Sequence, residues 1–330
     1  MMPPDRHANA VLRVAVVGEP TGWHVGRLLA ALTARGHQVT VVRWTDLVAE
    51  VRSEVRSEVC SEIRSEIRSR QSPRGAGNGT TSVERFLPPA IDAADLVVVR
   101  GMPGGGLEEV VFRMDLLGRL AARGTPVVNS PRGLEIAIDK YLSLARMAAA
   151  GLSVPRTMVA QSPDAIRAAW HVLGRDCVAK PIFGSRGRGI ARITDEASLV
   201  TLIDATTAAP PAGSVAYLQE FLPHDGWDVR ILLVGKDAFA MRRFAVDGEW
   251  RTNISLGGRP EAFSPPADWV ELARAAARAV ETEIAGVDLL PARDGRVVVL
   301  EVNAVPGWQG LEAATGIPIA DAIVRHLECR

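Results

Sequence analysis

Three side chains near the carboxyl end of the chain carry oxygen atoms that could bind a divalent metal ion. They are Asp288, Glu301 and Asn303. Carboxylate and amide oxygens suit a hard cation, and Mg²⁺ usually takes one or two protein carboxylates and leaves its other positions to water and phosphate. The residue types therefore indicate a magnesium site beside a phosphorylated substrate.

A hairpin would bring these three side chains to one face. Two β-rich runs within residues 286–303 are separated by an Asp-Gly pair, which is a strong hairpin signal. A two-residue loop places Asp288 opposite Glu301, and Asn303 shares their side because side chains alternate along a strand. A four-residue loop keeps this arrangement, whereas a three-residue loop would break it. The alternative is an ordinary hairpin whose acids face water, but both runs are apolar and a buried carboxylate needs a partner.

A glycine-rich segment could bind phosphate. Residues 177–193 have the pattern strand, glycine-rich loop, strand. Its loop glycines allow backbone N–H groups to crowd round an anion, and Lys180 adds positive charge. The segment lacks the Gly-Lys-Ser/Thr sequence that opens a helix in a Walker loop. A plain turn would give the same pattern, so this motif alone leaves phosphate binding open.

Further charged residues follow the glycine-rich segment. Residues 215–222 form an apolar run ending in Glu220, and Asp228 and Arg230 alternate onto one face of the next expected strand. Two more segments, residues 240–243 and 250–253, are expected as strands whose arginines converge on the same anion. The alternative for Asp228 and Arg230 is an exposed ion pair that contributes little to stability.

The amino-terminal elements form a βαβ unit. Residues 12–17 and 37–44 are expected strands on either side of an amphipathic helix. The glycines after the first strand are four residues apart, which is not the Gly-x-Gly-x-x-Gly spacing of dinucleotide-binding folds, and no acid for a ribose ends the second strand. A nicotinamide-dependent reductase is therefore excluded.

The rest of the chain alternates strands and helices. Ser130-Pro131 opens a helix with a cap residue and a proline at its first position, and a domain boundary is expected near Asn129. The other expected elements are strands at residues 95–100 and 126–129 and helices at residues 107–123, 140–150 and 269–282.

A tetrapeptide repeat interrupts the amino-terminal region. Residues 51–70 repeat Val/Ile-Arg-Ser-Glu with small changes and run into a Gly- and Ser-containing stretch that ends at residue 82. Arg and Glu two residues apart cannot form the pairs that stabilise a helix. We interpret residues 51–82 as a low-complexity surface insertion, partly helical or disordered and without catalytic residues, with a partner-binding helix as the alternative.

Composition limits the partners and the compartment. The chain has 330 residues, of which 47% are apolar, and its 38 basic residues equal its 38 acidic ones. A net charge of zero gives no general attraction to nucleic acid or to an anionic membrane. The polar amino terminus and the absence of a long apolar run give no sign of a signal peptide or membrane span. Three distant cysteines indicate a reducing cytoplasm. We expect a cytoplasmic protein without nucleic-acid or membrane partners.

The motifs in their order resemble the ATP-grasp superfamily and, within it, the RimK-like α-L-glutamate ligases. The resemblance covers roughly residues 95–325 and rests on Lys140, the Lys180 strand with its glycine loop, Gln219-Glu-Phe-Leu222, Asp228-Val-Arg230, Arg251-Thr-Asn253, Ala285-Gly-Val-Asp288 and Glu301-Val-Asn-Ala-Val-Pro-Gly307. It implies an ATP-grasp fold of α/β and α+β domains. The expected domains are a Rossmann-like amino-terminal α/β domain (residues 1–129), a central ATP-grasp subdomain (130–215) and a carboxy-terminal subdomain (216–330).

The resemblance also implies roles for individual residues. Arg251 and Lys180 match catalytic groups at the transferred phosphate, and Asp288, Glu301 and Asn303 match ligands of Mg²⁺ or Mn²⁺. Arg230 and Arg242 are expected to contact a substrate carboxylate. The residues that match nucleotide contacts are Lys140, Lys180, Gly184, Ser185, Gly187, Gly189, Glu220, Phe221, Asp228, Arg251 and Asn253.

The implied reaction joins a carboxylate to an amine. ATP would convert the carboxylate of a small, cofactor-like acceptor to an acyl phosphate, and the amine of L-glutamate would then displace phosphate. Phosphoryl transfer depends on positioning and charge neutralisation more than on protein nucleophiles. The chain departs from the family pattern in lacking a basic residue just before Gly257-Gly258, and Trp308 suggests a different acceptor pocket from that of the ribosomal-protein modifiers.

Several alternatives use the same nucleotide site. They are an ATP-grasp kinase, a ligase of a different amino acid, a modifier of a protein carboxyl terminus and a nucleotide-binding regulatory module without turnover. Release of ADP that depends on an amine would separate a ligase from a kinase. The resemblance is also compatible with a homo-oligomer.

Overall fold

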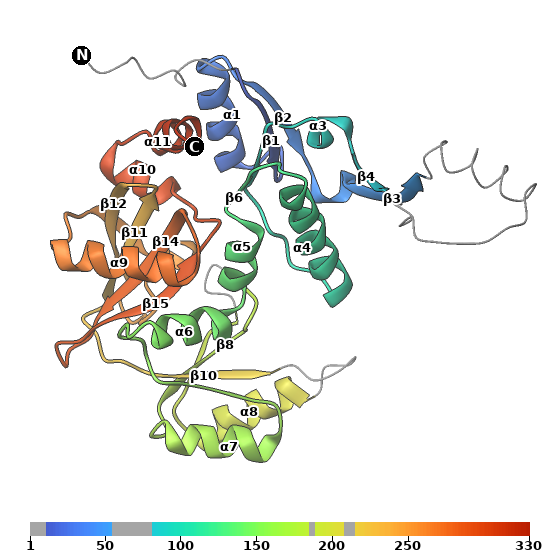
Figure 1. Cartoon of the computed structure of the whole chain (residues 1–330). Coiled ribbons are helices and arrows are strands. Elements are labelled where there is room, and N and C mark those ends of the chain that lie inside the picture. Colours follow the sequence, from blue (N-terminus) through green and yellow to red (C-terminus); the bar gives the residue numbers. More distant parts are fainter. Residues whose placement is uncertain (1–10, 55–80, 185–188, 208–214) are drawn as a thin grey trace, which may run out of the picture.

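The structure is a computed structural model that describes residues 11–54, 81–184, 189–207 and 215–330. Three sheets of four, four and five strands follow one another along the chain, with helices packed against them, and a two-stranded ribbon joins the first sheet (Figure 1). The predicted fold class, an ATP-grasp arrangement of α/β and α+β domains, is confirmed. None of the described helices is long and apolar enough to cross a membrane.

The amino-terminal sheet is parallel, as the βαβ pattern predicts. Its strands are β2 (Gln38–Val42), β1 (Arg13–Val17), β5 (Leu96–Val99) and β6 (Val127–Val128), in that order. Successive side chains of β1 enter different cores, because Val14 packs with α1 (Trp23–Ala34) and Ala15 packs with α4 (Leu107–Ala122). Helices thus cover both faces, which explains why these strands are continuously apolar.

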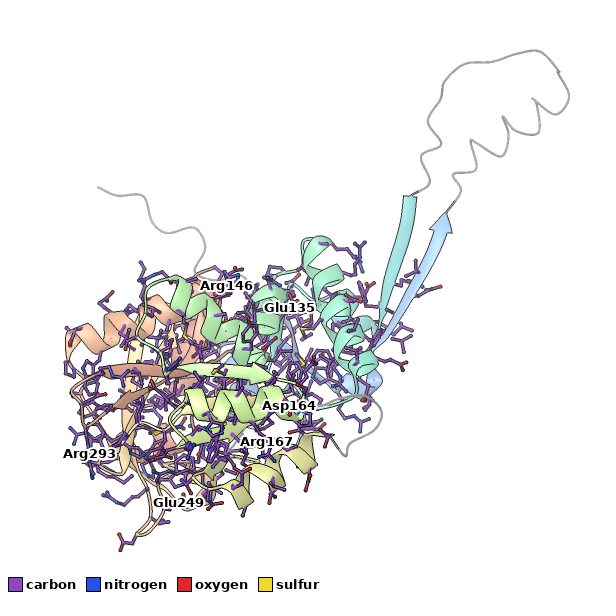
Figure 2. All side chains as sticks on the ribbon, turned by 90° about the horizontal axis from the view of Figure 1, so that it is seen from below. Glu135, Arg146, Asp164, Arg167, Glu249 and Arg293 are labelled. Atoms are coloured by element: carbon purple, nitrogen blue, oxygen red, sulfur yellow. The ribbon has the colours of Figure 1, made fainter. Side chains whose placement is uncertain are left out.

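The predicted insertion begins and ends as strand rather than helix. β3 (Val48–Glu54) pairs with β4 (Thr81–Leu87) in an antiparallel ribbon that extends away from the other sheets (Figures 1 and 2). The register places Glu50 opposite Arg85, two residues of opposite charge. The helical interpretation is therefore wrong for residues 51–54 and 81–82, and the rest of the repeat lies outside the described residues. Short elements beside the ribbon are η1 (Trp44–Asp46) and α3 (Pro89–Asp92).

The central sheet is antiparallel and has its own core. Its order is β7 (Thr157–Ala160), β10 (Ala216–Glu220), β8 (Cys177–Lys180) and β9 (Ala191–Ile193). α7 (Pro163–Val172) and α8 (Glu196–Thr207) pack against this sheet. The predicted boundary after residue 215 would remove β10, which pairs with both β7 and β8. The change of sheet instead falls after Glu220.

The carboxy-terminal sheet is also antiparallel. Its strands, in order, are β13 (Arg259–Ala262), β12 (Asp237–Phe244), β11 (Trp227–Val234), β14 (Ile284–Pro291) and β15 (Val297–Asn303). α9 (Ala267–Ala279) packs against it, and η2 (Ile254–Leu256) precedes β13. Residues 250–253, expected as a strand, form an irregular loop.

The β14–β15 hairpin confirms the predicted pairing, although its turn differs from the predicted one. Asp288 pairs with Glu301, as expected. The turn, however, is a three-residue loop in which Ala292 N–H donates to the carbonyl of Arg296 at 2.8 Å. Such a loop alone would break the arrangement, but a β-bulge at Leu300, between the paired Val299 and Glu301, adds one residue and restores it.

Helices from the connecting segments join the three sheets. α5 (Pro131–Ile138) and α6 (Lys140–Ala149) contribute Ile136, Leu144 and Met147 to the core under α9. α10 (Gln309–Thr315) and α11 (Ile319–Glu328) return to the first sheet, where α11 lies beside α1 (Figure 1). Trp308 is fully buried in this contact. Its suggested place in an acceptor pocket is therefore wrong, because the helical return covers its ring.

Asn129 connects the amino-terminal sheet to the β14–β15 hairpin. Its amide nitrogen donates to the carbonyls of Ile284 (2.7 Å) and Ala304 (2.6 Å), and its amide oxygen accepts from the N–H groups of Glu283 and Ile284, both at 2.9 Å. The side chain is buried, so all four bonds lie out of water. Asn129 therefore fixes the position of β14 against the first sheet.

We expect Asn129→Ala to lower the free energy of unfolding by about 3 kcal/mol, because truncation leaves buried backbone groups without partners. Urea denaturation measured by circular dichroism would test this. Gln309→Ala, at an exposed position, serves as the control. A loss no larger than that of the control would show that Asn129 does not join the two sheets.

Candidate functional site

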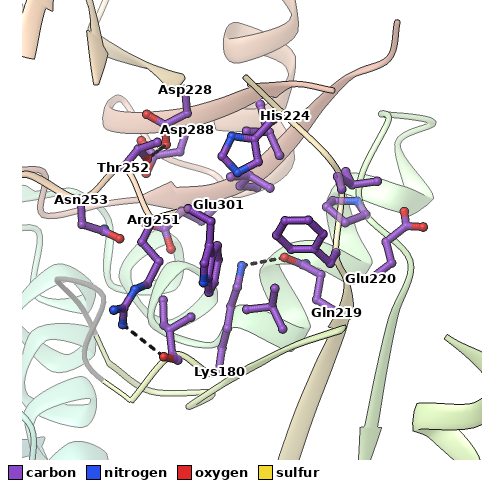
Figure 3. Close-up of a pocket in the computed structure, with 18 of the residues that line it drawn as sticks. Lys180, Gln219, Glu220, His224, Asp228, Arg251, Thr252, Asn253, Asp288 and Glu301 are labelled. Atoms are coloured by element: carbon purple, nitrogen blue, oxygen red, sulfur yellow. Dashed lines mark hydrogen bonds between the residues drawn. The ribbon is translucent and has the colours of Figure 1, made fainter. Parts of the chain in front are cut away.

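A pocket lies between the central and carboxy-terminal sheets (Figure 3). It contains about 720 Å³ of space, part of it open to solvent. One end has aliphatic walls, whereas charged side chains from β8, β11, β12, β14 and β15 line the rest. The aliphatic lining residues are Pro155, Val178, Ile190, Leu222, Leu290 and Leu300.

Lys180 lies in the pocket at the end of β8. Its ammonium donates to the amide oxygen of Gln219 at 2.6 Å (Figure 3). Burial lowers the pKa of Lys180, and the negative charge of Glu301 partly opposes this shift. Gln219 is itself held by Thr157, to which it donates at 3.1 Å. The sequence analysis used Gln219 only as part of a motif. The antiparallel pairing of β8 with β10 could have indicated its place beside Lys180.

Lys140 reaches the same region from the start of α6. Its ammonium donates to the carbonyls of Ile182 (3.3 Å) and Gly184 (2.7 Å), and burial lowers its pKa. Both predicted lysines therefore lie at the beginning of the glycine-rich loop. Gly189, at the end of that loop, has a φ of +70°, a conformation that favours glycine. Ser185 and Gly187 lie outside the described residues.

Glu220, the last residue of β10, and Phe221, directly after it, line the pocket. The guanidinium of Arg192 lies 3.5 Å from the centre of the Phe221 ring, and the ring of Trp250 meets the Phe221 ring edge-on at 5.8 Å. Both rings line the pocket, so its apolar wall is partly aromatic. The carboxylate of Glu220 accepts from the N–H of Arg156 at 2.9 Å. That hydrogen bond anchors Glu220 to the preceding loop.

A chain of alternating charges is buried beneath the pocket. Arg243 donates to both oxygens of Asp228, at 2.7 and 2.5 Å, and its second contact is Asp288 at 2.9 Å. Arg230 donates to both oxygens of Asp288, at 2.7 Å each. Burial alone would raise the pKa of Asp288, but the charges of Arg230 and Arg243 outweigh it and lower that pKa. Thr252 completes the chain by donating to Asp228 at 2.6 Å.

Arg242 was assigned a substrate contact from the sequence, whereas its neighbour Arg243 was expected only among the arginines that converge on the anion. β12 turns successive side chains to opposite faces, and Arg243 pairs with Asp228 across the sheet. Arg242 points the other way, with its guanidinium 4.8 Å from the ring centre of Trp227 and 4.1 Å from that of Phe263. The structure therefore places Arg243, not Arg242, among the residues that line the pocket.

The oxygen ligands predicted for a metal share one face but differ in availability. Asp288 already accepts three hydrogen bonds or ion pairs from arginines, so its carboxylate has little capacity left. Glu301 has one distant contact, Arg230 at 3.7 Å, and Asn303 accepts from the N–H of Val305 at 3.0 Å. The part of the chain that the structure describes contains no group of three His, Cys, Asp or Glu side chains suited to a metal.

These donors still fit a hard cation that keeps several waters and phosphate oxygens. Glu301 is the carboxylate that is free to bind in full, Asn303 retains one lone pair on its amide oxygen, and Asp288 retains one on Oδ1. Mg²⁺ requires no more than one or two protein carboxylates. The assignment of these residues as metal ligands stays a prediction.

Arg251 and Asn253 enter the pocket from the loop before η2. The guanidinium of Arg251 donates to the carbonyl of Ile190 at 3.3 Å, next to the glycine-rich loop (Figure 3). Asn253 lines the pocket one residue beyond Thr252. The loop therefore links the two sheets that form the pocket. Together with Lys180 and the rings of Phe221 and Trp250, it brings positive charge and apolar surface into one pocket.

Comparisons with known proteins agree with this site. Residues 137–327 match the RimK-like ATP-grasp domain. The tetrahydromethanopterin:α-L-glutamate ligase of Methanosarcina acetivorans is 33% identical over 261 residues, which cover 71% of this chain and 80% of that protein. A probable α-L-glutamate ligase of Mannheimia succiniciproducens is 32% identical over 229 residues, covering 69% of this chain and 75% of that protein.

Solved structures share the fold at lower identity. The ATP-grasp ligase PsnB in complex with a minimal precursor superposes with a TM-score of 0.66 and 24% identity, covering 96% of this chain and all of that one. A RimK domain ATP-grasp protein from Sphaerobacter thermophilus gives a TM-score of 0.65 at 21% identity, covering 95% of this chain and 98% of that one. At this identity the likeness supports the fold alone.

We expect Arg243→Met to lower the free energy of unfolding by roughly 3–5 kcal/mol, because it leaves buried carboxylates without their shared cation. Urea denaturation would measure the loss. Adding Asp228→Asn to the same chain should recover part of it, since the second change removes one of the uncompensated charges. Arg259→Met, which removes an exposed arginine, is the control. Equal losses in the two single variants would contradict the buried network.

Proposed function

Because this chain belongs to the RimK-like ATP-grasp family and is an ATP-grasp ligase, we propose that it joins L-glutamate to a small carboxylated acceptor. The proposed reaction consumes ATP and releases ADP and phosphate through an acyl-phosphate intermediate. The observation that carries the proposal is the match to glutamate ligases over more than two thirds of the chain. A pocket lined by Lys180, Glu220, Phe221, Asp228, Arg251 and Asn253, all of them predicted nucleotide contacts, supports it.

The nucleotide would lie across the pocket. The aromatic surface at Phe221 and the aliphatic wall suit the base, and Lys140 and Lys180 would contact the phosphates at the glycine-rich loop. Burial has already removed both ammonium groups from most of the solvent, so their attraction to phosphate is screened less than at a surface. Arg251 would contact the phosphate that is transferred.

The chemistry needs positioned charges rather than a protein nucleophile. An oxygen of the acceptor carboxylate attacks the terminal phosphorus of ATP and ADP leaves. The amine nitrogen of glutamate then attacks the acyl carbon, the bond between that carbon and the phosphate oxygen breaks, phosphate leaves with the electron pair, and the nitrogen loses a proton. Arg230, at the edge of the charge network, would hold a substrate carboxylate. Mg²⁺ held by Glu301, Asn303 and Asp288 would neutralise charge on the phosphates when bound.

Mass spectrometry of reaction mixtures tests this function. The purified protein is incubated with ATP, Mg²⁺ and L-glutamate against a panel of carboxylated cofactors, including pterins and deazaflavins. We expect one acceptor to gain the mass of a glutamyl residue, with ADP release that depends on glutamate. Phosphorylated acceptor without amine dependence would instead identify a kinase, and a product formed from another amino acid would correct the donor.

We expect Glu301→Ala to abolish ADP release while leaving the fold intact, because Glu301 has free capacity for a metal and its ion pair with Arg230 is long, at 3.7 Å. A coupled assay for ADP and a thermal unfolding curve would check both parts. Glu271→Ala, which removes a largely exposed acid on α9, is the control. Full activity in the Glu301 variant would refute the assigned role.

A further inference from the structure

Among the described residues, Arg251 makes one hydrogen bond outside its own loop, and its other hydrogen bonds come from within that loop. It lies in the irregular loop between β12 and η2, where no strand or helix sets the direction of its side chain. Its bond to the carbonyl of Ile190, at 3.3 Å, is long for a hydrogen bond. An arginine side chain loses rotamer entropy when it is ordered. A group that orders Arg251 before the nucleotide arrives would therefore increase the contribution of Arg251 to nucleotide binding.

Glu249 is that group. Its Oε1 accepts from Nε of Arg251 at 3.0 Å, and its Oε2 accepts from Nη2 at 2.6 Å. These two parallel bonds form the planar fork in which a carboxylate holds a guanidinium most firmly. The pair is half-buried, with 20% of the Glu249 side chain and 27% of the Arg251 side chain exposed.

The backbone in turn holds Glu249. Its Oε1 also accepts from the N–H groups of Trp250 (2.9 Å) and Arg251 (3.0 Å), so the carboxylate folds back over its own loop. A turn precedes it, in which the N–H of Glu249 donates to the carbonyl of Val246 at 3.0 Å and Gly248 has a φ of +81°. The hydrogen bonds from Arg251 lower the pKa of Glu249 to about 2, so the carboxylate is ionised at neutral pH.

The fork leaves the other edge of the guanidinium for a ligand. Glu249 accepts from Nε and from one N–H of Nη2, whereas Nη1 donates to the carbonyl of Ile190 (Figure 3). A guanidinium has five N–H donors, so the edge formed by Nη1 and Nη2 keeps donors that a phosphate could accept. Glu249 therefore holds one edge of the Arg251 guanidinium, and the edge formed by Nη1 and Nη2 stays available to a ligand.

We propose that Glu249 is a positioning residue that fixes the guanidinium of Arg251 against the terminal phosphate of bound ATP. The inference rests on the proposed function, in which Arg251 contacts the transferred phosphate. It assigns to Glu249 no contact with substrate. The proposed role of Glu249 affects binding of ATP and not of ADP, because ADP lacks the terminal phosphate that Arg251 would contact.

An opposing interpretation predicts the opposite sign. If Glu249 were only a counter-charge, its carboxylate would weaken the attraction of Arg251 for any phosphate, and neutralising it would tighten binding of the triphosphate. If Glu249 positions Arg251, neutralising it loosens the guanidinium and weakens binding of the triphosphate. Glutamine separates the two, because its amide oxygen can still accept from the loop N–H groups while its amide nitrogen cannot accept from Arg251.

Titration calorimetry with Mg²⁺ and either ADP or a nonhydrolysable ATP analogue makes the measurement without an acceptor. We expect Glu249→Gln to lower the preference for the ATP analogue over ADP by about tenfold, the order of one charge-assisted hydrogen bond, with ADP affinity unchanged. Glu249→Asp keeps the charge on a shorter side chain and should give an intermediate loss. It also keeps the test decisive if the glutamine variant does not fold.

Two further variants complete the design. Glu261→Gln removes the acid of an exposed Arg259–Glu261 pair on β13 and should leave both affinities unchanged. Arg251→Met should lower the analogue preference at least as much as Glu249→Gln. If Arg251→Met lowers it and neither Glu249 variant does, or if Glu249→Gln raises it, the inference is overturned while the proposed function stands. If Arg251→Met leaves the preference unchanged, the role of Arg251 in the proposed function fails as well.

Discussion

Four charges of alternating sign, three of them buried and one half-buried, determine how the pocket is built. Arg230, Asp288, Arg243 and Asp228 follow one another across β14, β11 and β12, and each carboxylate binds the guanidinium groups beside it. A shift of one residue in any of these strands would turn a charge into an apolar layer without its partner, which is far more costly than losing an exposed ion pair. The network therefore fixes the register of the sheet that carries the proposed metal and phosphate ligands.

The two walls of the pocket depend on different forces. The carboxy-terminal wall is ordered by the buried ions, whereas the central sheet is held by an apolar core of its own and offers Lys180 through a bond to Gln219. The loop that carries Arg251 crosses between them, with Thr252 bonded to Asp228 and Arg251 pointing to Ile190. A separate apolar contact, centred on Trp308, and the four hydrogen bonds of Asn129 set the first sheet against this assembly.

The sequence predictions that failed concern residues whose placement depends on pairing with another strand. The hairpin shows this most clearly. Asp288 does face Glu301, but through a three-residue loop and a bulge at Leu300 whose effects cancel, and neither has a strong signal in the sequence. Arg242 and Arg243 are adjacent and chemically identical, so only their register against Asp228 determines which one enters the pocket. The strand character of residues 51–54 likewise depends on a partner strand that begins at Thr81.

The sequence by itself determined most of the order of strands and helices, the parallel first sheet and the glycine-rich hairpin, because periodicity and turn residues act over short distances. Only the tertiary structure decided that Asp288 is shared by two arginines, that Arg243 rather than Arg242 lies beneath the pocket, and that Trp308 belongs to the core. These outcomes depend on which faces of strands far apart in the chain are buried together. A buried charge takes its partner from whatever residue the fold brings within hydrogen-bonding distance.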